Sequence, residues 1–340
     1  MIETPDVPYG VAAWSRPEFR DHAQAWLDQQ LAAAGIERIG EIEQPRVRPW
    51  ATVLRAPTTV GTVWMKAAGP QTAFEVEFYP LLARTVPERV LTPLAADTTR
   101  GWVLLPDGGP TLGDRLEDSE LVQRFVDALV HYARLQRTLA PHVGDLLALG
   151  VADMRPQVMP ERFEQALEAA APYVEQHGDP EARAAFARVG RLPDAVATWC
   201  SQLVDSRLPP SLDHNDLHPW NVLDGARFYD WGDSVVAHPF AAMLVPLGFV
   251  QRLLDVDLDN AQYVRARDAY LDVFADDAPG EDLASTLALA CTVAKIARAL
   301  TWDRALRAAR DQGEEVEETW ASAPFESLSS LLDDTYVGRT

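Results

Sequence analysis

Lysine is nearly absent from this sequence of 340 residues, because only Lys66 and Lys295 are lysine among 30 basic residues. Arginine is the usual cation here, so a position that holds lysine instead needs a reason of its own. Acidic residues outnumber basic ones by 51 to 30, which gives a formal net charge of −21. Such a charge repels phosphate and excludes general binding to nucleic acid or to anionic membrane surfaces. A phosphate-bearing ligand would need local neutralisation, for example by a metal ion.

Cysteine is also scarce, and no long hydrophobic run is present. Cys200 and Cys291 are the only cysteines and lie far apart, which excludes a disulfide framework and gives no zinc-binding spacing. No run of about 18 apolar residues is available to span a membrane. The first ten residues, MIETPDVPYG, lack the basic and apolar pattern of a secretory signal. We therefore expect a cytoplasmic protein that has no membrane partner.

The first third of the chain is predicted to be rich in β-strands. A helix is expected first, over residues 17–35, where apolar residues recur at helical spacing until Gly35. Short β-rich pieces follow at 46–57, 61–68 and 101–109. Between the second and third of these pieces, apolar residues recur at helical spacing over 72–85, so a helix is predicted there. Pro80 must either kink this helix or belong to its first turn.

Beyond about residue 110 the pattern is mostly helical. Periodic segments cover 117–140, 160–177, 180–205, 238–255, 261–275, 282–310 and 315–333. One polar stretch, 212–231, interrupts them and is predicted to form a β-hairpin. A β-rich first third followed by a helical remainder predicts an α+β fold.

The polar stretch carries more functional groups than a turn needs. LDHNDLHPWNVL (212–223) and FYDWGDS (228–234) contain Asp216, Asn221 and Asp230. Phosphoryl transfer uses an Asp that orients the acceptor hydroxyl and takes its proton, together with oxygen ligands for Mg²⁺ on the nucleotide phosphates. Asp216 is the predicted base, and Asn221 and Asp230 are the predicted metal ligands. One such residue alone would more simply cap a turn, but their combination in this order favours catalysis.

The motifs HNDLHPWNVL and FYDWGD resemble the catalytic loop and the metal-binding segment of the aminoglycoside phosphotransferase and choline kinase superfamily. The resemblance extends over most of the chain and implies a bilobal protein kinase-like fold that uses ATP and Mg²⁺. It divides the chain into an N-terminal helical cap over 1–35, a β-rich nucleotide-binding N-lobe over 36–105, and a helical C-lobe over 106–340. The C-lobe would hold the catalytic loop and the acceptor site.

The same resemblance assigns the nucleotide-binding residues. It implies a lysine on the third strand and a helix glutamate that pairs with it, which VWMKAA and FEVEFYPLL supply as Lys66 and Glu75. Glu77, two residues further, would face another side of the helix. The segment that links the lobes corresponds to WVLLPDGG, where backbone groups from Leu105 to Asp107 would bind adenine.

Other positions around the catalytic loop are assigned in the same way. His214 is expected to be structural, with its imidazole bonded to backbone. Trp220 either borders the acceptor pocket or packs under the loop, and Asp233 either binds metal or substrate or caps the next helix. Gln136 stands where the superfamily's long helix has a histidine. The sequence departs from the superfamily at one point. Kinases usually cover the phosphates with a loop that contains glycine, whereas the equivalent segment here, QPRVRPWATVL (44–54), contains none.

The acceptor site is expected late in the chain, because the superfamily binds its acceptor between the catalytic loop and the C-terminal helices. DQGEEVEETWASAPFES (311–327) places Glu314, Glu317 and Glu318 before Trp320. Carboxylates beside an aromatic ring suit a cationic, ring-shaped acceptor. Acids at the start of a helix also favour its macrodipole without any ligand, so each Glu has this simpler interpretation too.

The fuller form HNDLHPWNVL…FYDWGDSVVAHPF resembles the glucosamine kinases of this superfamily. That resemblance implies ATP-dependent phosphorylation of the 6-hydroxyl of D-glucosamine, which gives glucosamine 6-phosphate. An aminoglycoside kinase or another amino-sugar or sugar-alcohol kinase is the alternative with the same chemistry. A non-catalytic nucleotide-binding pseudokinase is the alternative from another class, and the retention of Lys66, Asp216, Asn221 and Asp230 disfavours it. The sequence predicts no oligomeric state.

Overall fold

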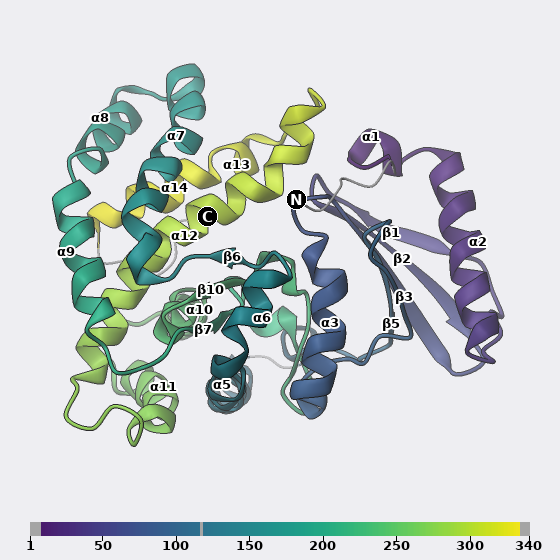
Figure 1. The fold of residues 1–340 in the computed structure, drawn as a ribbon, viewed down its shortest axis with the longest axis horizontal. Helices are drawn as coiled ribbons and strands as arrows, with labels where there is room; N and C mark the ends of the chain where they lie inside the picture. The colour runs from purple at the N-terminus through teal and green to yellow at the C-terminus, as the bar shows by residue number, and fades with distance from the viewer. Residues whose placement is uncertain (1–7, 116–117, 334–340) are drawn as a thin grey trace. The chain divides into compact units, whose positions relative to one another are not determined.

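The computed structural model describes residues 8–115 and 118–333. Its α+β architecture confirms the prediction, because a β-sheet lies in the N-terminal region and helices make up most of the rest (Figure 1). The chain forms two compact units. The first consists of Met1–Gly109, Arg227–Gly232 and Arg304–Glu317, and the second of Pro110–Ala226, Asp233–Asp303 and Glu318–Thr340.

A five-stranded antiparallel sheet forms the centre of the first unit. In the order β1-β2-β3-β5-β4, its strands are β1 (Glu43–Val47), β2 (Ala51–Thr58), β3 (Gly61–Ala68), β5 (Trp102–Pro106) and β4 (Ala95–Asp97). The unit also contains helix α1 (Val11–Trp14) and the short strand β9 (Arg227–Phe228). Lys66 lies in the central strand β3, opposite Val53 of β2 and Val103 of β5.

The alternation of side chains along β3 decides which way Lys66 faces. Met65 and Ala67 are buried in one hydrophobic cluster with Trp26 of helix α2 (Pro17–Ala33). Because successive residues of a strand point to opposite faces of the sheet, Lys66 projects from the other face. Helix α2 therefore covers the face of the sheet that does not carry the lysine (Figure 1).

Helix α3 (Phe74–Thr85) places Glu75 in the same unit. The helix continues through Pro80 and does not start at it. Proline has no backbone N–H, so the helical hydrogen bond from residue 80 to the oxygen of Val76 cannot form, while the turns on either side persist. Glu75 is only 1% exposed, whereas Glu77 is exposed to solvent, as the helical geometry predicted.

Helices make up most of the second unit. They are α4 (Leu112–Arg115), α5 (Asp118–Leu139), α6 (Val143–Ala148), α7 (Met159–His177), α8 (Pro180–Val189), α9 (Pro193–Val204), α10 (Leu244–Leu254), α11 (Ala261–Leu271), α12 (Leu283–Asp311), α13 (Glu318–Ala321) and α14 (Ala323–Ser329). The last turns of α12, from Arg304, are grouped with the first unit.

A small three-stranded sheet supports the predicted catalytic loop, residues 212–223, of the second unit. Its strands, in spatial order, are β6 (Ala152–Asp153), β10 (Val235–Ala237) and β7 (Ser211–Asp213). β10 pairs with β7 in antiparallel fashion, with Val235 opposite Asp213. Strand β8 (Val222–Leu223) follows the loop. The loop therefore starts from a strand that is paired and buried.

Two segments that were predicted as single helices are broken. Residues 180–205 form α8 and α9, because Gly190 caps the first helix and Pro193 starts the second. Residues 315–333 form α13, α14 and a 3₁₀ turn over Ser330–Leu332, and Pro324 lies in the first turn of α14. Glycine and proline thus outweigh the apolar periodicity that suggested continuous helices.

Helix α12 is the one helix, within the residues that the structure describes, with the length and composition to cross a membrane. Its most apolar 18-residue window has a mean hydropathy of 1.5, and half of that window is buried inside the protein. The helix also carries the hydrogen-bonded polar residues Lys295 and Arg298. These features are typical of a core helix.

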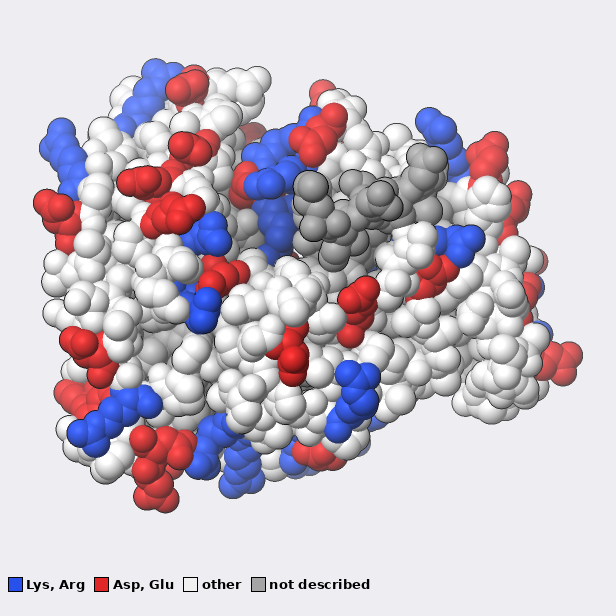
Figure 2. Space-filling view, viewed as in Figure 1, with Lys and Arg blue, Asp and Glu red and all other residues white. Residues whose placement is uncertain are grey.

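Charged side chains of both signs are interspersed on the face shown in Figure 2. The sequence carries 21 more acidic than basic residues. On this face the acidic side chains do not form one continuous patch.

Candidate active site

Lys66 lies between two carboxylates in the first unit. Its Nζ is 2.6 Å from Oε2 of Glu75 and 2.5 Å from Oδ1 of Asp230. The other oxygen of Glu75 accepts a hydrogen bond from the backbone N–H of Trp231 at 3.0 Å. Three residues that the sequence singled out, from a strand, a helix and the Asp-Trp-Gly segment, thus come together.

The backbone of the Asp-Trp-Gly segment makes room for this cluster. Asp230 has a φ of 63°, in the left-handed region that non-glycine residues seldom adopt. Its N–H donates to the hydroxyl of Tyr79 at 3.4 Å. A Cβ at Gly232 would lie 3.2 Å from Oε2 of Glu75 and 3.4 Å from Nζ of Lys66, so glycine leaves the space that the ion pair occupies.

The surrounding charges keep Lys66 protonated. Burial alone would lower the pKa of this amine, because an ammonium loses hydration inside the protein. The carboxylates of Asp230 and Glu75 outweigh that effect and raise the pKa of Lys66 above its ordinary value. The cluster therefore presents a permanent ammonium and a partly exposed carboxylate, Asp230, side by side.

The segment predicted to bind adenine ends strand β5. Leu105 pairs with Trp64 of β3 and is 7% exposed. The N–H of Asp107 donates to the backbone oxygen of Thr62 at 3.1 Å, and Oδ1 of Asp107 accepts from the N–H of Gly109 at 3.0 Å. These hydrogen bonds fix the chain as it leaves the sheet. The contact with adenine stays a prediction.

Asp216, the predicted base, lies in the second unit shortly after β7. Its Oδ1 accepts a hydrogen bond from Nη2 of Arg298 at 2.8 Å, and its Oδ2 is 3.4 Å from Nε2 of His218. Burial alone would raise the pKa of Asp216, but Arg298 and His218 outweigh it and hold that pKa well below its ordinary value. The carboxylate therefore stays ionised under physiological conditions.

The residues before Asp216 are anchored in the interior. His214 is fully buried, and its backbone N–H donates to the hydroxyl of Tyr132 at 2.8 Å. Asn215 has a φ of 60° and donates from Nδ2 to the hydroxyl of Thr301 at 2.7 Å. The loop is thus tied to α5 and α12. The predicted contact of the His214 imidazole with backbone stays a prediction.

Gln136, which replaces the expected histidine, joins three elements of the second unit. Its Nε2 donates to the backbone oxygens of Leu212 and Pro239, each at 2.8 Å. Its Oε1 accepts from the hydroxyl of Tyr270 at 2.6 Å. The residue is fully buried, so the amide satisfies backbone groups that would otherwise be costly to bury.

Asn221 and Asp230 present the kind of oxygen atoms that Mg²⁺ prefers. The amide nitrogen of Asn221 donates to the backbone oxygen of Asp216 at 2.9 Å, which leaves the amide oxygen available. Across residues 8–115 and 118–333, no group of three or more His, Cys, Asp or Glu side chains is placed to hold a metal ion. Mg²⁺ at nucleotide sites takes one or two protein carboxylates together with phosphate oxygens, so the carboxylate of Asp230 and the amide oxygen of Asn221, each taken by itself, are chemically suited to such a site.

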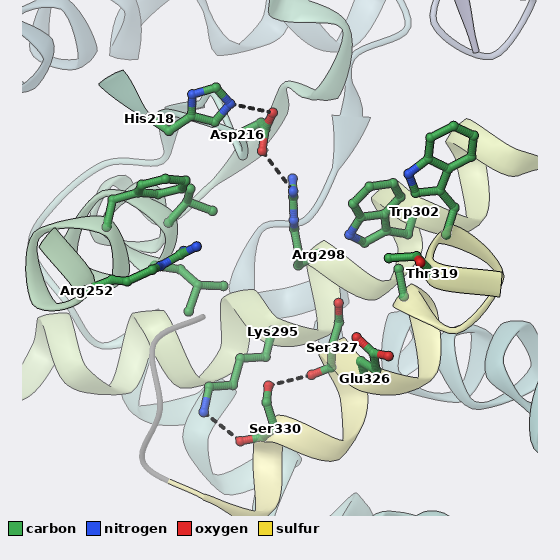
Figure 3. A pocket seen from close by; sticks show the side chains of 15 residues that line it. Asp216, His218, Arg252, Lys295, Arg298, Trp302, Thr319, Glu326, Ser327 and Ser330 are labelled. Atoms are coloured by element: carbon green, nitrogen blue, oxygen red, sulfur yellow. Dashed lines mark hydrogen bonds and ion pairs between the residues drawn. The ribbon is translucent and has the colours of Figure 1, made fainter. Parts of the chain in front are cut away.

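A cavity of about 250 Å³ lies beside Asp216 in the second unit (Figure 3). Its other charged walls come from Arg252, Lys295, Arg298 and Glu326. Ring faces are supplied by His218, Phe249, Trp302 and Trp320, and hydroxyls by Thr319, Ser327 and Ser330. Such a mixture of rings, hydroxyls and charges suits a small polar molecule.

Some of the residues predicted to bind the acceptor lie at or near this cavity. Trp320 lines it. Oδ2 of Asp233 lies 3.6 Å from Nη1 of Arg298, which itself lines the cavity. Trp220 is 40% exposed and lies against Gly113, where a Cβ would come within 2.5 Å of the indole. Trp220 therefore packs against helix α4 and is not among the described residues that line the cavity.

The three glutamates predicted from the sequence are not among the described residues that line the cavity. The carboxylate of Glu314 accepts hydrogen bonds from the N–H groups of Val11 and Ala12, at 3.1 and 2.8 Å, and so caps helix α1. Glu317 and Glu318 are exposed. Their part in acceptor binding stays a prediction that no contact supports.

The residues of the cavity that sequence reasoning missed include Arg252, Arg298, Trp302 and Glu326. Arg298, Thr301 and Trp302 are three and four residues apart on α12, so they share one helix face. That spacing was the only signal in the sequence that could have grouped these residues. It was not sufficient, because charged residues at helical spacing usually face solvent and nothing in the sequence linked this helix face to the catalytic loop.

Lys295, the second of the two lysines, also lines the cavity. It is 5% exposed, and its Nζ donates to the backbone oxygens of Ser330 and Asp333 at 2.7 and 3.0 Å. A compact ammonium with three donors suits two converging carbonyl groups. The scarcity of lysine in the sequence therefore marked Lys295, a buried residue that holds the segment after α14 in place.

Comparison with known proteins gives one family. The model of a phosphotransferase enzyme family matches residues 54–279, which is more than half of the chain. No curated protein sequence matches the chain.

Several solved structures share the fold. A macrolide 2'-phosphotransferase from Brachybacterium faecium has a TM-score of 0.56 at 18% identity, over 89% of this chain and 98% of its own. A choline kinase from Streptococcus pneumoniae has a TM-score of 0.56 at 15% identity, over 91% and 99%. An amicoumacin kinase, solved with AMP-PNP and Ca²⁺, has a TM-score of 0.52 at 13% identity, over 93% and 97%. At these identities the likeness shows the fold, and it confirms the predicted kinase-like architecture.

Proposed function

The chain belongs to the phosphotransferase enzyme family, and from that premise we propose that it transfers the γ-phosphoryl group of ATP to a hydroxyl of D-glucosamine. The observation that carries the phosphotransferase assignment is the placement of Lys66 between Glu75 and Asp230, at 2.6 and 2.5 Å. Here a buried glutamate fixes an ammonium group beside a carboxylate that can bind metal. This arrangement suits the phosphates of a nucleoside triphosphate.

In the first unit, the proposed roles concern the nucleotide. Lys66, oriented by Glu75, binds oxygens of the α- and β-phosphates, and backbone groups from Leu105 to Asp107 bind adenine. Asp230 would hold Mg²⁺ together with Asn221 of the second unit, and the metal would neutralise charge on the phosphates. The net charge of −21 makes this neutralisation necessary, because an unshielded phosphate would be repelled. The proposal that these residues bind the nucleotide is supported by the chemistry of their side chains and by the family to which the chain belongs.

In the second unit, the proposed roles concern the acceptor. Asp216 accepts a hydrogen bond from the acceptor hydroxyl. The hydroxyl oxygen bonds to the γ-phosphorus as the bond to the bridging oxygen of ADP breaks, and the hydroxyl proton passes to Asp216. Because its pKa is held low, Asp216 is a weak base in the resting enzyme. Its contribution is therefore mainly to orient the hydroxyl and to take the proton late in the step.

The choice of glucosamine is supported by the cavity as well as by the motif resemblance. Its volume of about 250 Å³ suits a small acceptor, and the indoles of Trp302 and Trp320 in its wall are compatible with the C–H groups of a sugar. Hydroxyls of Thr319 and Ser327 can bond sugar hydroxyls. The buried, unpaired cysteines Cys200 and Cys291 are compatible with a reducing cytoplasm, where we propose that the reaction takes place.

The proposal is tested by measuring ADP release from Mg²⁺-ATP in the presence of glucosamine, glucose, N-acetylglucosamine, choline and kanamycin. Glucosamine is expected to stimulate ADP release most. Kanamycin as the best acceptor would move the assignment to an aminoglycoside kinase, with the phosphotransfer chemistry unchanged. If nucleotide bound but no acceptor raised ADP release, the chain would be a nucleotide-binding module without catalysis.

A further inference from the structure

Glu326 differs from Asp216, the other carboxylate that lines the acceptor cavity. Arg298 is neutralised by Asp216 at 2.8 Å and lies 3.6 Å from Asp233. Lys295 is engaged by the backbone oxygens of Ser330 and Asp333. Glu326, by contrast, forms no ion pair with any residue in the described part of the chain. The cavity therefore contains one carboxylate whose charge is not balanced by a protein cation.

A neutral hydrogen bond orients this carboxylate. The buried hydroxyl of Ser322 donates to Oε1 of Glu326 at 2.7 Å. A hydroxyl donor fixes the direction of a carboxylate but leaves its negative charge in place. The second oxygen, Oε2, is therefore available to a ligand, and the cost of ordering the side chain has already been met in the free protein.

The charge of the cavity changes from one side to the other. Arg252, from α10, stacks its guanidinium 4.4 Å from the ring centre of Phe249. Figure 3 shows Arg252 on one side of the cavity and Glu326, from α14, on the other. A cationic group on a ligand is repelled by the first side and attracted by the second, and both effects are stronger in a partly enclosed cavity than in water. A ligand with one ammonium group therefore has a preferred orientation.

Hydroxyl and aromatic groups are found on the same side of the cavity as Glu326. Thr319, Ser327 and Trp302 lie on its side of the cavity in Figure 3. Hydroxyls and an indole beside a carboxylate suit a molecule that carries hydroxyls and an ammonium on a compact carbon frame. Asp216 lines the same cavity, so a ligand held at Glu326 can present a hydroxyl to the base.

We propose that Glu326 selects acceptors that carry an ammonium group, by pairing with this group while Asp216 contacts the hydroxyl that receives the phosphoryl group. The proposal rests on the phosphotransferase function and names the specificity-determining residue for it. On this proposal, selectivity requires neither Glu314, which caps α1, nor the exposed Glu317 and Glu318.

The test compares kcat/KM for glucosamine and glucose in the parent, in Glu326→Gln and in Glu168→Gln. Glutamine keeps the shape of Glu326 and an oxygen that accepts from Ser322, while it removes the charge. Glu168 is an exposed acid of α7 and serves as the matched control. The parent is expected to prefer glucosamine by roughly 10²-fold, and Glu326→Gln should lower that preference by at least about tenfold through glucosamine alone. Glu168→Gln should leave it unchanged.

Two outcomes separate the failure of this inference from the failure of the proposed function. If the parent phosphorylates no acceptor, the phosphotransferase proposal itself is wrong. If the parent prefers glucosamine and Glu326→Gln keeps that preference, or if Glu318→Gln removes it instead, then phosphotransfer stands and the role of Glu326 is overturned.

Ser322→Ala guards against a folding artefact at this position. It removes the hydrogen bond at 2.7 Å but leaves the charge of Glu326, so the preference for glucosamine should survive within about threefold. Equal loss of preference in Ser322→Ala and Glu326→Gln would mean that local structure, and not charge, sets selectivity, which contradicts the proposal. Nucleotide affinity should be the same in all the variants.

Discussion

Arg298 donates to Asp216 at 2.8 Å and ties the proposed base to the long helix α12. The same guanidinium donates to the backbone oxygen of Asn215 at 2.6 Å and lies 3.6 Å from Asp233. One half-buried side chain thus fixes the position of the carboxylate, the backbone before it and the charge around it. Arg298 acts on the reaction through Asp216, so it is a positioning residue.

Loss of Arg298 is expected to slow the reaction and change its pH dependence. Arg298→Gln should lower kcat by about 10², because a base that is misplaced by roughly 1 Å loses about this factor. Without the guanidinium, the largest effect that opposes burial is lost, so the pKa of Asp216 rises. The protonated, inactive form then appears at higher pH, so the acid limb of the kcat profile should move upward.

The control for this variant is Arg183→Gln, which removes an exposed arginine of α8. It should leave both kcat and the pH profile unchanged. An Arg298→Gln enzyme with reduced kcat but an unshifted acid limb would show that Arg298 holds the loop without setting the charge state of Asp216.

Removal of the base itself should affect chemistry and spare nucleotide binding. Asp216→Ala is expected to lower kcat by roughly 10² to 10⁴, the usual contribution of a positioned general base. The affinity for ATP should stay within a few-fold, because the proposed nucleotide ligands are other residues. Rapid-quench or steady-state kinetics together with calorimetric titration of a non-hydrolysable ATP analogue measure the two effects. Full activity in the variant would exclude Asp216 as the base.

Asp230 is expected to control nucleotide binding through Mg²⁺. Asp230→Ala should abolish the Mg²⁺-dependent part of nucleotide affinity, since the metal is what allows phosphates to bind in so acidic a protein. Asp224→Ala, at an exposed carboxylate of the neighbouring turn, is the control and should bind as the parent does. Titration of the ATP analogue with and without Mg²⁺ gives the answer. An equal gain in affinity from Mg²⁺ in Asp230→Ala and the parent would rule Asp230 out as a ligand.

Asp213, at the end of β7, should make stability depend on pH. Burial raises the pKa of its carboxyl to about 7, although the N–H of Asn215 donates to it at 2.6 Å. Between its ordinary value of 3.8 and about 7, the folded protein keeps a proton that the unfolded chain has lost. Asp213 therefore favours folding most below pH 4, and this contribution falls as pH rises toward 7.

The Asp213→Asn variant lacks this titrating group, so its stability can be compared with that of the parent at each pH. The difference in free energy of unfolding between variant and parent should move in favour of the variant from pH 4 to pH 7, by at most a few kcal/mol. Thermal or urea unfolding at pH 4, 5.5, 7 and 8 measures it. A difference that is constant over this range would mean that Asp213 does not titrate there.

Much of the first unit was accessible from the sequence because its signals are local. The strand that carries Lys66 has a period of two, the helix that carries Glu75 follows a few residues later, and the scarcity of lysine marked Lys66. The Asp-Trp-Gly motif then identified Asp230, whose contact with Lys66 spans 164 residues. Local pattern and motif together located this cluster.

The residues that line the acceptor cavity could not be predicted from local patterns in the sequence. Arg298 contacts Asp216 across 82 positions of the chain, and the contact depends on how α12 packs below the loop. Glu326 lies in the segment that the sequence marked as acidic, but Pro324 and the short helices there turn it into the cavity instead of Glu317 and Glu318. A helical pattern cannot foresee such breaks, because tertiary packing decides which face is buried.

The most direct test of phosphoryl transfer to an amino sugar is to identify the product by mass spectrometry and phosphorus NMR after incubation with Mg²⁺-ATP and glucosamine. The account predicts glucosamine 6-phosphate and ADP in equal amounts, and almost no product with Asp216→Ala. ADP formed without any phosphorylated sugar, or product formed equally well by Asp216→Ala, would contradict it.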